Sequence, residues 1–168
     1  MTRRTLQMTA ILFSVLALPA PDLRAQSVEV TPAALAVKAD IVAVGTVNSL
    51  VAHWNADHSR ILTSVTVSVD QYVKGGTPGQ PLMIVVPGGE VDGVGELYSH
   101  TATFQQGENV LVFAEKDSRG NYRVCSGQQG KYTVRKDEST GNLTVGGTMT
   151  LDGMTALVKK AMVDQNQK

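Results

Sequence analysis

The chain has 168 residues, a formal net charge of zero at pH 7, and hydrophobic residues at 42% of its positions. This length is typical of one domain, and the apolar share is enough for an ordinary core. The balanced charge and the lack of a basic cluster argue against nucleic-acid binding, which requires a basic surface.

The first 25 residues have the pattern of a secretory signal peptide. Two arginines precede an apolar run at residues 8–20. That run is shorter than the roughly 20 apolar residues of a spanning helix. We expect cleavage after Ala25 rather than after Ala20, because Pro21 would then follow the cut. An uncleaved membrane anchor is the alternative.

Cleavage after Ala25 leaves a single domain at residues 26–168, secreted or periplasmic and without membrane contact. It removes three of the 15 basic and one of the 15 acidic residues, so the formal net charge becomes −2. Cys125 is the only cysteine, so no intramolecular disulfide can form. We expect it to be buried within a strand at 122–127, as a small apolar side chain rather than a reactive thiol.

The first elements after the leader are a short helix and two strands. Thr31 followed by Pro32 is a helix-start signature, and the helix can be only two turns long. Residues 41–44 are apolar at both odd and even positions, which predicts a strand buried on both faces. A polar segment at 52–60 predicts a long hairpin loop. Beyond it the side chains alternate, which predicts that Val65, Val67 and Val69 share one buried face.

The rest of the chain predicts several short strands and one longer helix. We expect strands at 82–87, 109–115, 122–127, 131–136 and 143–147, and an amphipathic helix at about 150–166 capped by Thr150 or Asp152. The fold class is therefore mainly β. We expect an antiparallel, five- to seven-stranded OB-like barrel, with a short N-terminal helix and a C-terminal helix.

A glycine-rich segment follows the 82–87 strand and contains Glu90, Asp92 and Glu96. No helix start and no Lys-Ser/Thr pair follow the glycines, so the pattern does not fit a phosphate loop. The acids also do not match the spacing of an EF-hand calcium loop. We expect a bulge or tight bend, in which at least one of the glycines at 88, 89, 93 and 95 takes a positive φ.

The polar segment at 52–60 holds His53, Trp54 and His58. A zinc site needs three or four ligands, and His100 is distant in sequence, so we expect no metal. Trp54 has two possible roles: it anchors an interface, or it covers the open end of a barrel.

No established catalytic motif is present, because the chain contains neither G-x-S-x-G nor H-E-x-x-H. Ser99 and His100 are adjacent, and neighbouring residues on a strand would point to opposite faces. Nothing in the sequence indicates that a loop carboxylate is desolvated, as acid–base catalysis needs. We therefore expect a protein that is not an enzyme and needs no cofactor.

Three short motifs resemble the core of netrin-like domains, the group that includes the tissue inhibitors of metalloproteinases. They are Ala39–Asp40–Ile41, Lys74–Gly75 and Gly107–Glu108, and the resemblance covers residues 38 to about 135. It implies an OB-type barrel with helices packed against it. Those inhibitors chelate zinc with an N-terminal cysteine and contain disulfides. This chain has no such cysteine, so the resemblance does not extend to that mechanism.

The sequence therefore predicts an exported, non-enzymatic binding domain whose partner is another exported protein. One alternative is an inhibitor or accessory factor of an exported protease, acting without zinc chelation. Another is a small hydrolase that uses Glu90, Asp92 or His100. Loops on a rigid scaffold commonly carry binding. The candidate contact residues are His53, Trp54, His58, Glu90, Asp92 and Glu96.

Overall fold

A computed structural model describes residues 29–167. The expected signal peptide and its cleavage site lie outside these residues. The elements are α1 (Pro32–Lys38), β1 (Ile41–Trp54), β2 (Ile61–Lys74), β3 (Leu82–Pro87), β4 (Gly89–Val91), β5 (Val94–Glu96), β6 (Asn109–Lys116), β7 (Tyr122–Val124), the 3₁₀ helix η1 (Gly127–Gly130), β8 (Lys131–Lys136), β9 (Leu143–Val145), β10 (Met149–Thr150) and α2 (Leu151–Asn166). Within this part of the chain, no helix is both long and apolar enough to cross a membrane.

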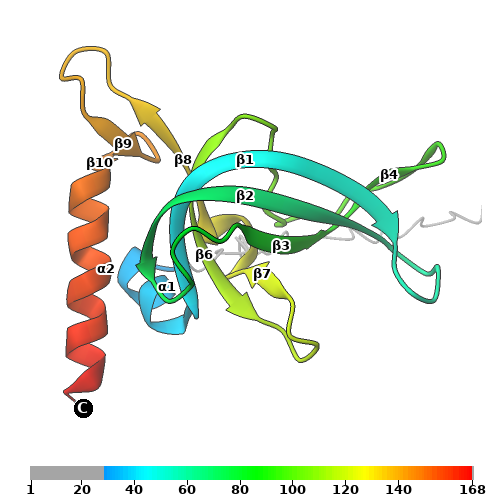
Figure 1. The fold of residues 1–168 in the computed structure, drawn as a ribbon, viewed down its shortest axis with the longest axis horizontal. Coiled ribbons are helices and arrows are strands. Elements are labelled where there is room, and N and C mark those ends of the chain that lie inside the picture. Colours follow the sequence, from blue (N-terminus) through cyan, green and yellow to red (C-terminus); the bar gives the residue numbers. More distant parts are fainter. Residues whose placement is uncertain (1–28, 168) are drawn as a thin grey trace, which may run out of the picture.

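Five strands close into a barrel, which confirms the mainly β barrel class (Figure 1). Their order is β1-β2-β3-β7-β6, and β6 pairs again with β1. The β3–β7 pair is parallel, through Ile84 and Tyr122, whereas the other four pairs are antiparallel. This corrects the expectation of a wholly antiparallel barrel. An odd number of strands in a closed ring cannot all alternate in direction, so at least one neighbouring pair must be parallel.

The barrel carries two additions, one on either side. On one side β8 continues the sheet from β6, and β9 and β10 follow it beside α2. On the other side β4 and β5 form a separate two-stranded sheet near the turn between β1 and β2. Figure 1 shows α2 and the β4–β5 hairpin at opposite ends of the molecule. The surface around α2 and the surface around the β4–β5 hairpin are therefore far apart.

Two apolar clusters share the start of β1. Ile41 and Ala43 belong to one cluster, together with residues of the barrel strands and Phe104 from the segment before β6. Val42 and Val44 belong to the other, together with residues of both helices. Residues 41–44 are all buried. The predicted burial of this strand on both faces is confirmed, because one face meets the barrel cluster and the other meets the helices.

The alternation predicted for β2 is confirmed at its centre. Val65 and Val67 are buried, whereas Val69 is only half-buried. Val73, four residues later, is buried in the cluster beneath the helices. Three register shifts between β1 and β2 accompany this change of cluster. Such irregularities bend and twist a strand pair, so one long strand can serve two cores.

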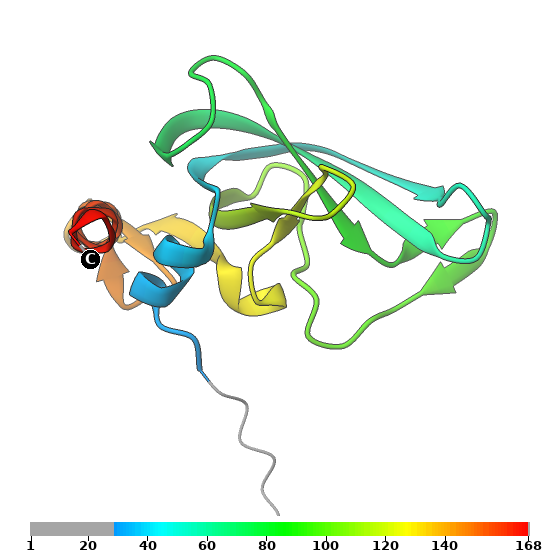
Figure 2. The ribbon, with the colours of Figure 1, turned by 90° about the horizontal axis from the view of Figure 1, so that it is seen from below.

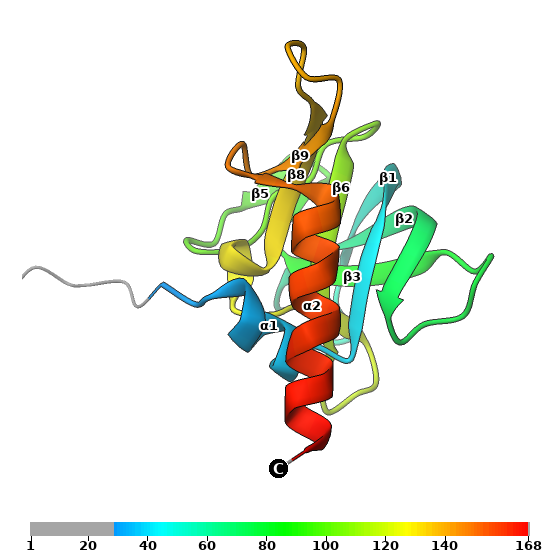
Figure 3. The same ribbon diagram turned by 90° about the vertical axis from the view of Figure 1, so that its left-hand side faces the viewer.

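The two helices begin where the sequence predicted. The hydroxyl of Thr31 accepts a hydrogen bond from Ala34 N (3.3 Å), and the hydroxyl of Thr150 accepts one from Gly153 N (3.1 Å). Both bonds satisfy amides that have no partner within the helix. Figure 2 looks along α2 with α1 beside it, and Figure 3 shows α2 in front of α1.

Cys125 is fully buried in the cluster that the helices cover. It follows the last residue of β7 rather than lying within a strand. Burial raises the pKa of its thiol to about 11, so the thiol stays protonated at neutral pH. The structure thus supports the predicted apolar role.

Candidate functional site

Two hairpins lie at the end of the barrel opposite α2, and their tips point in different directions (Figure 1). One has its turn at residues 55–60 between β1 and β2, and the other belongs to β4 and β5. Ile61 N–H and C=O both bond to the second segment: the amide donates to Glu96 Oε2 (3.1 Å) and the carbonyl accepts from Gly88 N (2.9 Å). We call residues 54–60 and 89–98 together the distal end.

The glycine-rich segment contains the tight bend that we expected, and the bend is the turn of a β-hairpin that we did not predict. Val91 pairs with Val94, and Asp92 and Gly93 between them have φ values of 52° and 77°. Two successive positive φ values are typical of a type I′ hairpin turn, for which Asp-Gly is a favoured pair. An Asp-Gly pair between two valines was therefore a sequence signal for this hairpin, and our sequence reasoning missed it.

The expected positive φ is confirmed at three of the four glycines, and Gly89 shows the reason most clearly. Its φ is 133°, and a Cβ there would lie 2.6 Å from Thr63 Oγ1 and 3.0 Å from Ala52 Cβ. Gly88 and Gly93 also have positive φ, whereas Gly95 does not. Glycine at position 89 thus allows the hairpin to pack closely against β1 and β2.

Glu96 connects the hairpin to the barrel. Its Oε2 atom accepts from Ile61 N (3.1 Å) and from the Tyr98 hydroxyl (2.9 Å). The hydrogen bond to Glu96 raises the pKa of Tyr98. We predicted Glu96 as a contact residue, but the structure places its carboxylate in contacts within the protein.

Leu97 is the most exposed large apolar side chain among residues 29–167, with 94% of its surface accessible. It lies between Glu96 and Tyr98, which are both half-buried and bonded to each other. Val94 on the same hairpin is 49% exposed. Sequence reasoning did not identify Leu97, because a single leucine among polar residues has no periodic pattern to mark it.

The other two predicted acids are exposed on the hairpin. Glu90 lies on β4, and Asp92 occupies the first position of the turn. Among residues 29–167, no group of three or more His, Cys, Asp or Glu side chains is placed to hold a metal ion.

The turn between β1 and β2 is shorter than the loop predicted at 52–60. β1 continues to Trp54, so His53 and Trp54 lie on a strand. The Asn55 side-chain oxygen accepts from the amides of Ser59 (2.9 Å) and Arg60 (3.0 Å). The Ser59 hydroxyl donates to Asp57 (2.9 Å), and this bond lowers the pKa of Asp57. These local bonds give the turn a defined conformation.

Each of the three histidines has different contacts. The ring of His58 stacks on Trp54, with centroids 6.1 Å apart. His53 Nδ1 lies 3.0 Å from the Trp54 carbonyl oxygen, and its Nε2 lies 3.0 Å from Ser64 Oγ. His100 occupies a turn rather than a strand, with φ of 63°. Trp54 is half-buried and belongs to neither apolar cluster, so its ring does not close the barrel.

The His53–Ser64 contact is a pairing that sequence reasoning missed. The Trp54 carbonyl can accept only from a protonated Nδ1, so in the neutral ring Nε2 is left to accept from the serine hydroxyl. A serine and a histidine in this arrangement resemble a nucleophile and its base. The two residues lie on neighbouring strands, eleven positions apart, and were not recognisable as a pair before the β1–β2 register was known.

A small cavity of about 170 Å³ lies beside the hairpin. Leu50, Val86 and Phe104 line it, together with Thr63 and Tyr98. Pockets for drug-sized ligands are commonly about 300–1,000 Å³. The cavity beside the hairpin is therefore smaller than such pockets.

The first two motifs of the netrin-like resemblance join α1 to the barrel. Asp40 Oδ2 accepts from Lys116 N (2.7 Å). Lys74 Nζ donates to the carbonyls of Ala36 (2.8 Å) and Val37 (3.3 Å) at the end of α1. A Cβ on Gly75 would lie 2.3 Å from the Asp40 carbonyl oxygen, so only glycine fits there. These residues have structural roles.

The third motif connects β6 to β8. Glu108 forms an ion pair with Lys131, and its Oε1 accepts from the Thr133 hydroxyl (2.7 Å). Burial alone would raise the pKa of Glu108, but the hydrogen bonds from Lys131 and Thr133 outweigh it and hold the pKa below its ordinary value of 4.5. Like the other two motifs, this one attaches a neighbouring element to the barrel, in this case β8.

No protein-family model matches the chain, and a search of curated proteins found no matching relative.

Proposed function

We propose that this chain is an exported, non-enzymatic interaction domain that binds a protein partner through its distal end. The observation that carries the proposal is Leu97, an apolar side chain 94% exposed on a segment bonded to the barrel. A scattered exposed leucine needs no explanation. Leu97 differs because the residues on both sides of it are held in place.

The attachment of this segment favours binding for an energetic reason. Ordering a loop and its side chains on association costs free energy. The bonds of Glu96 to Ile61 N and to Tyr98, formed in the free protein, reduce that cost. The backbone around Leu97 is already ordered in the free protein. Its side chain can therefore enter an apolar pocket of a partner without the cost of ordering that backbone.

The neighbouring turn adds side chains that suit an interface. Trp54 stacks on His58 at the end of β1, outside both apolar clusters. Tryptophan is enriched among the residues that dominate binding energy. Glu90 and Asp92 are exposed on the adjacent hairpin. The distal end thus combines apolar anchors with acidic groups that outnumber its single basic residue, Arg60. We propose a partner surface with an apolar pocket and basic groups around it.

We also propose that the domain is netrin-like. The structural roles of Asp40, Lys74 and Glu108 support this, because the three motifs that carry the resemblance attach α1 and β8 to one barrel. The proposal is that the fold is shared, and it does not include the zinc-chelating mechanism. The partner of such a domain could be an exported protease that the domain inhibits. Identifying the captured protein tests this alternative.

Two matched variants test the proposal. Leu97→Asp places a charge on the distal end, and Leu143→Asp places the same charge on β9, where Leu143 is 47% exposed. The exported protein is used to capture partners from the envelope and medium of its own cells. We expect Leu97→Asp to abolish capture, while Leu143→Asp behaves like the parent. Equal capture by all three proteins would refute the distal end as the contact surface.

A further inference from the structure

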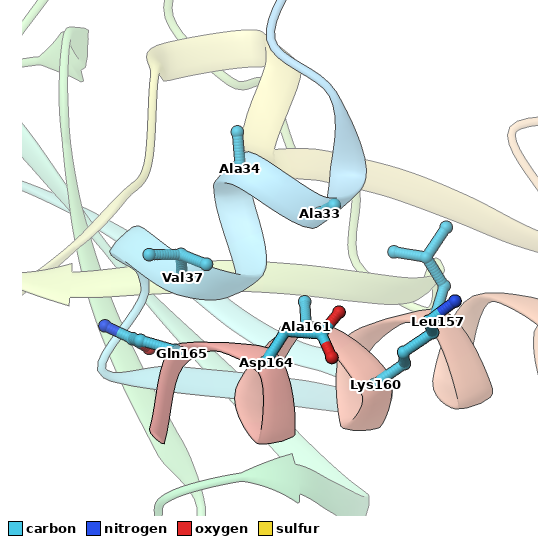
Figure 4. Close-up of a pocket in the computed structure, with 8 residues that line it drawn as sticks. All are labelled: Ala33, Ala34, Val37, Leu157, Lys160, Ala161, Asp164 and Gln165. Carbon is cyan, nitrogen blue, oxygen red and sulfur yellow. The ribbon is translucent and has the colours of Figure 1, made fainter. Parts of the chain in front are cut away.

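A groove between the two helices lies at the end of the molecule opposite the distal end. Its volume is about 520 Å³, and residues of α1 and of α2 from Leu157 onward line it (Figure 4). We name it the helix groove. Its lining residues are Ala33, Val37, Leu157, Lys160, Ala161 and Asp164, together with Ala34 and Gln165. No step of the proposed function uses this surface.

The apolar part of the helix groove is built from small side chains. Ala33 and Ala34 on α1 and Ala161 on α2 leave room for another backbone to approach. Val37 beside them is 42% exposed, although valine is usually buried. A groove of this kind suits the apolar side of another helix.

The charges beside the groove indicate which helix would bind there. Lys160 and Asp164 lie one turn apart on α2, and both are exposed. Among residues 29–167, neither belongs to an ion pair. If a second α2 lay antiparallel across the first, with a twofold axis level with position 162, each Lys160 would face Asp164 of the partner subunit. Such an arrangement forms two equivalent ion pairs from one surface.

From this self-complementarity we propose that the helix groove is a homodimer interface, in which α2 of one copy packs against α1 and α2 of the other. Leu157 and Ala161 lie four residues apart and present one side of α2 to the partner. The apolar contact supplies affinity, and the opposite charges determine orientation and register. The inference does not depend on the distal end. In such a dimer, the two distal ends remain accessible for binding.

The experiment measures the oligomeric state of the exported protein over a range of concentrations by sedimentation equilibrium. The parent is expected to dimerise reversibly, and more weakly at high salt, because exposed ion pairs are screened. Lys160→Asp and Asp164→Lys each set like charges against one another and should raise the dimer dissociation constant by about tenfold or more. The double variant restores opposite charges and should return it close to the parent value.

Lys159→Asp is the control, because Lys159 is also exposed but does not line the groove. It should leave dimerisation unchanged. The proposal fails if the parent stays monomeric at millimolar concentration, if the two lysine variants behave alike, or if the double variant does not recover. A monomer whose Lys160→Asp variant loses a captured protein would assign the groove to a different partner and would also overturn the dimer.

Discussion

Glu96 and Glu90 lie on the same hairpin but differ in their surroundings. The Glu96 carboxylate accepts two hydrogen bonds, one of them from a backbone amide 35 residues away. Glu90 is exposed on β4. The same residue type thus stabilises the fold at one position and is available to a partner at the other. Two predictions belong to this scale.

The first concerns the carboxylate at position 96. Glu96→Ala should lower the free energy of unfolding by about 1–3 kcal/mol, because the Ile61 amide loses its partner. Glu90→Ala is the control and should change it by less than about 0.5 kcal/mol, as is usual for surface positions. Urea unfolding measures both. Equal losses in the two variants would show that the Glu96 contacts add nothing to stability.

The second prediction concerns the effect of acidic pH on the stability of the protein. The pKa of Glu108 is lowered in the folded protein, so its ionised form binds protons less readily there than in the unfolded chain. Its contribution to stability is therefore present above about pH 4.5 and is lost as the pH falls through the folded-state pKa. Glu108→Gln should be less stable than the parent at pH 7, and the difference should shrink on acidification. A difference that does not depend on pH would contradict this assignment.

At the scale of elements, the β4–β5 hairpin depends on glycine at specific positions. Gly89→Ala should destabilise the protein by about 1 kcal/mol or more, since its φ is positive and a Cβ would contact Thr63 and Ala52. Gly95 has no positive φ and has open space around its Cβ position, so Gly95→Ala should have little effect. Thermal unfolding of both variants compares them directly. If Gly95→Ala is the more damaging change, the packing described for the hairpin is wrong.

At the scale of the whole molecule, the start of β1 links the two apolar clusters. Ile41 contributes to the barrel cluster and Val42 to the helix-covered cluster. The clusters therefore share one backbone segment, and neither can lose its packing without disturbing the other. We expect a single cooperative unfolding unit.

Two core variants test this cooperativity. Val67→Ala in the barrel cluster and Val158→Ala in the helix cluster each delete buried methyl groups, and each should cost about 1–3 kcal/mol. Trp54 is the only tryptophan, so its fluorescence reports on the distal end, whereas circular dichroism reports on all the elements. Both signals should shift together in both variants. A helical transition that precedes the Trp54 transition in Val158→Ala would show two independent units.

The sequence alone determined features that depend on a few neighbouring residues. The start of α1 at Thr31 and the burial of Val65 and Val67 follow from local sterics and periodicity, and the structure confirms them. The sequence also predicted a positive φ at one or more of the glycines at 88, 89, 93 and 95, without saying which, and a cap for α2 at Thr150 or Asp152; the structure shows the positive φ at three of these glycines and the cap at Thr150. The β4–β5 hairpin was equally local, and its Asp-Gly signal was present but not recognised.

Only the tertiary structure decided what joins distant segments. Closure of five strands requires a parallel pair, and no pattern within one strand identifies which pair it is. The sequence marked Glu96 as a polar loop residue, but its bond to Ile61 exists only because the hairpin folds back onto β2. Leu97 stands out for the same reason: its exposure is a property of the assembled surface and not of its neighbours in the chain. A side chain's type is local information, whereas its burial and its partners depend on residues that the fold brings from elsewhere.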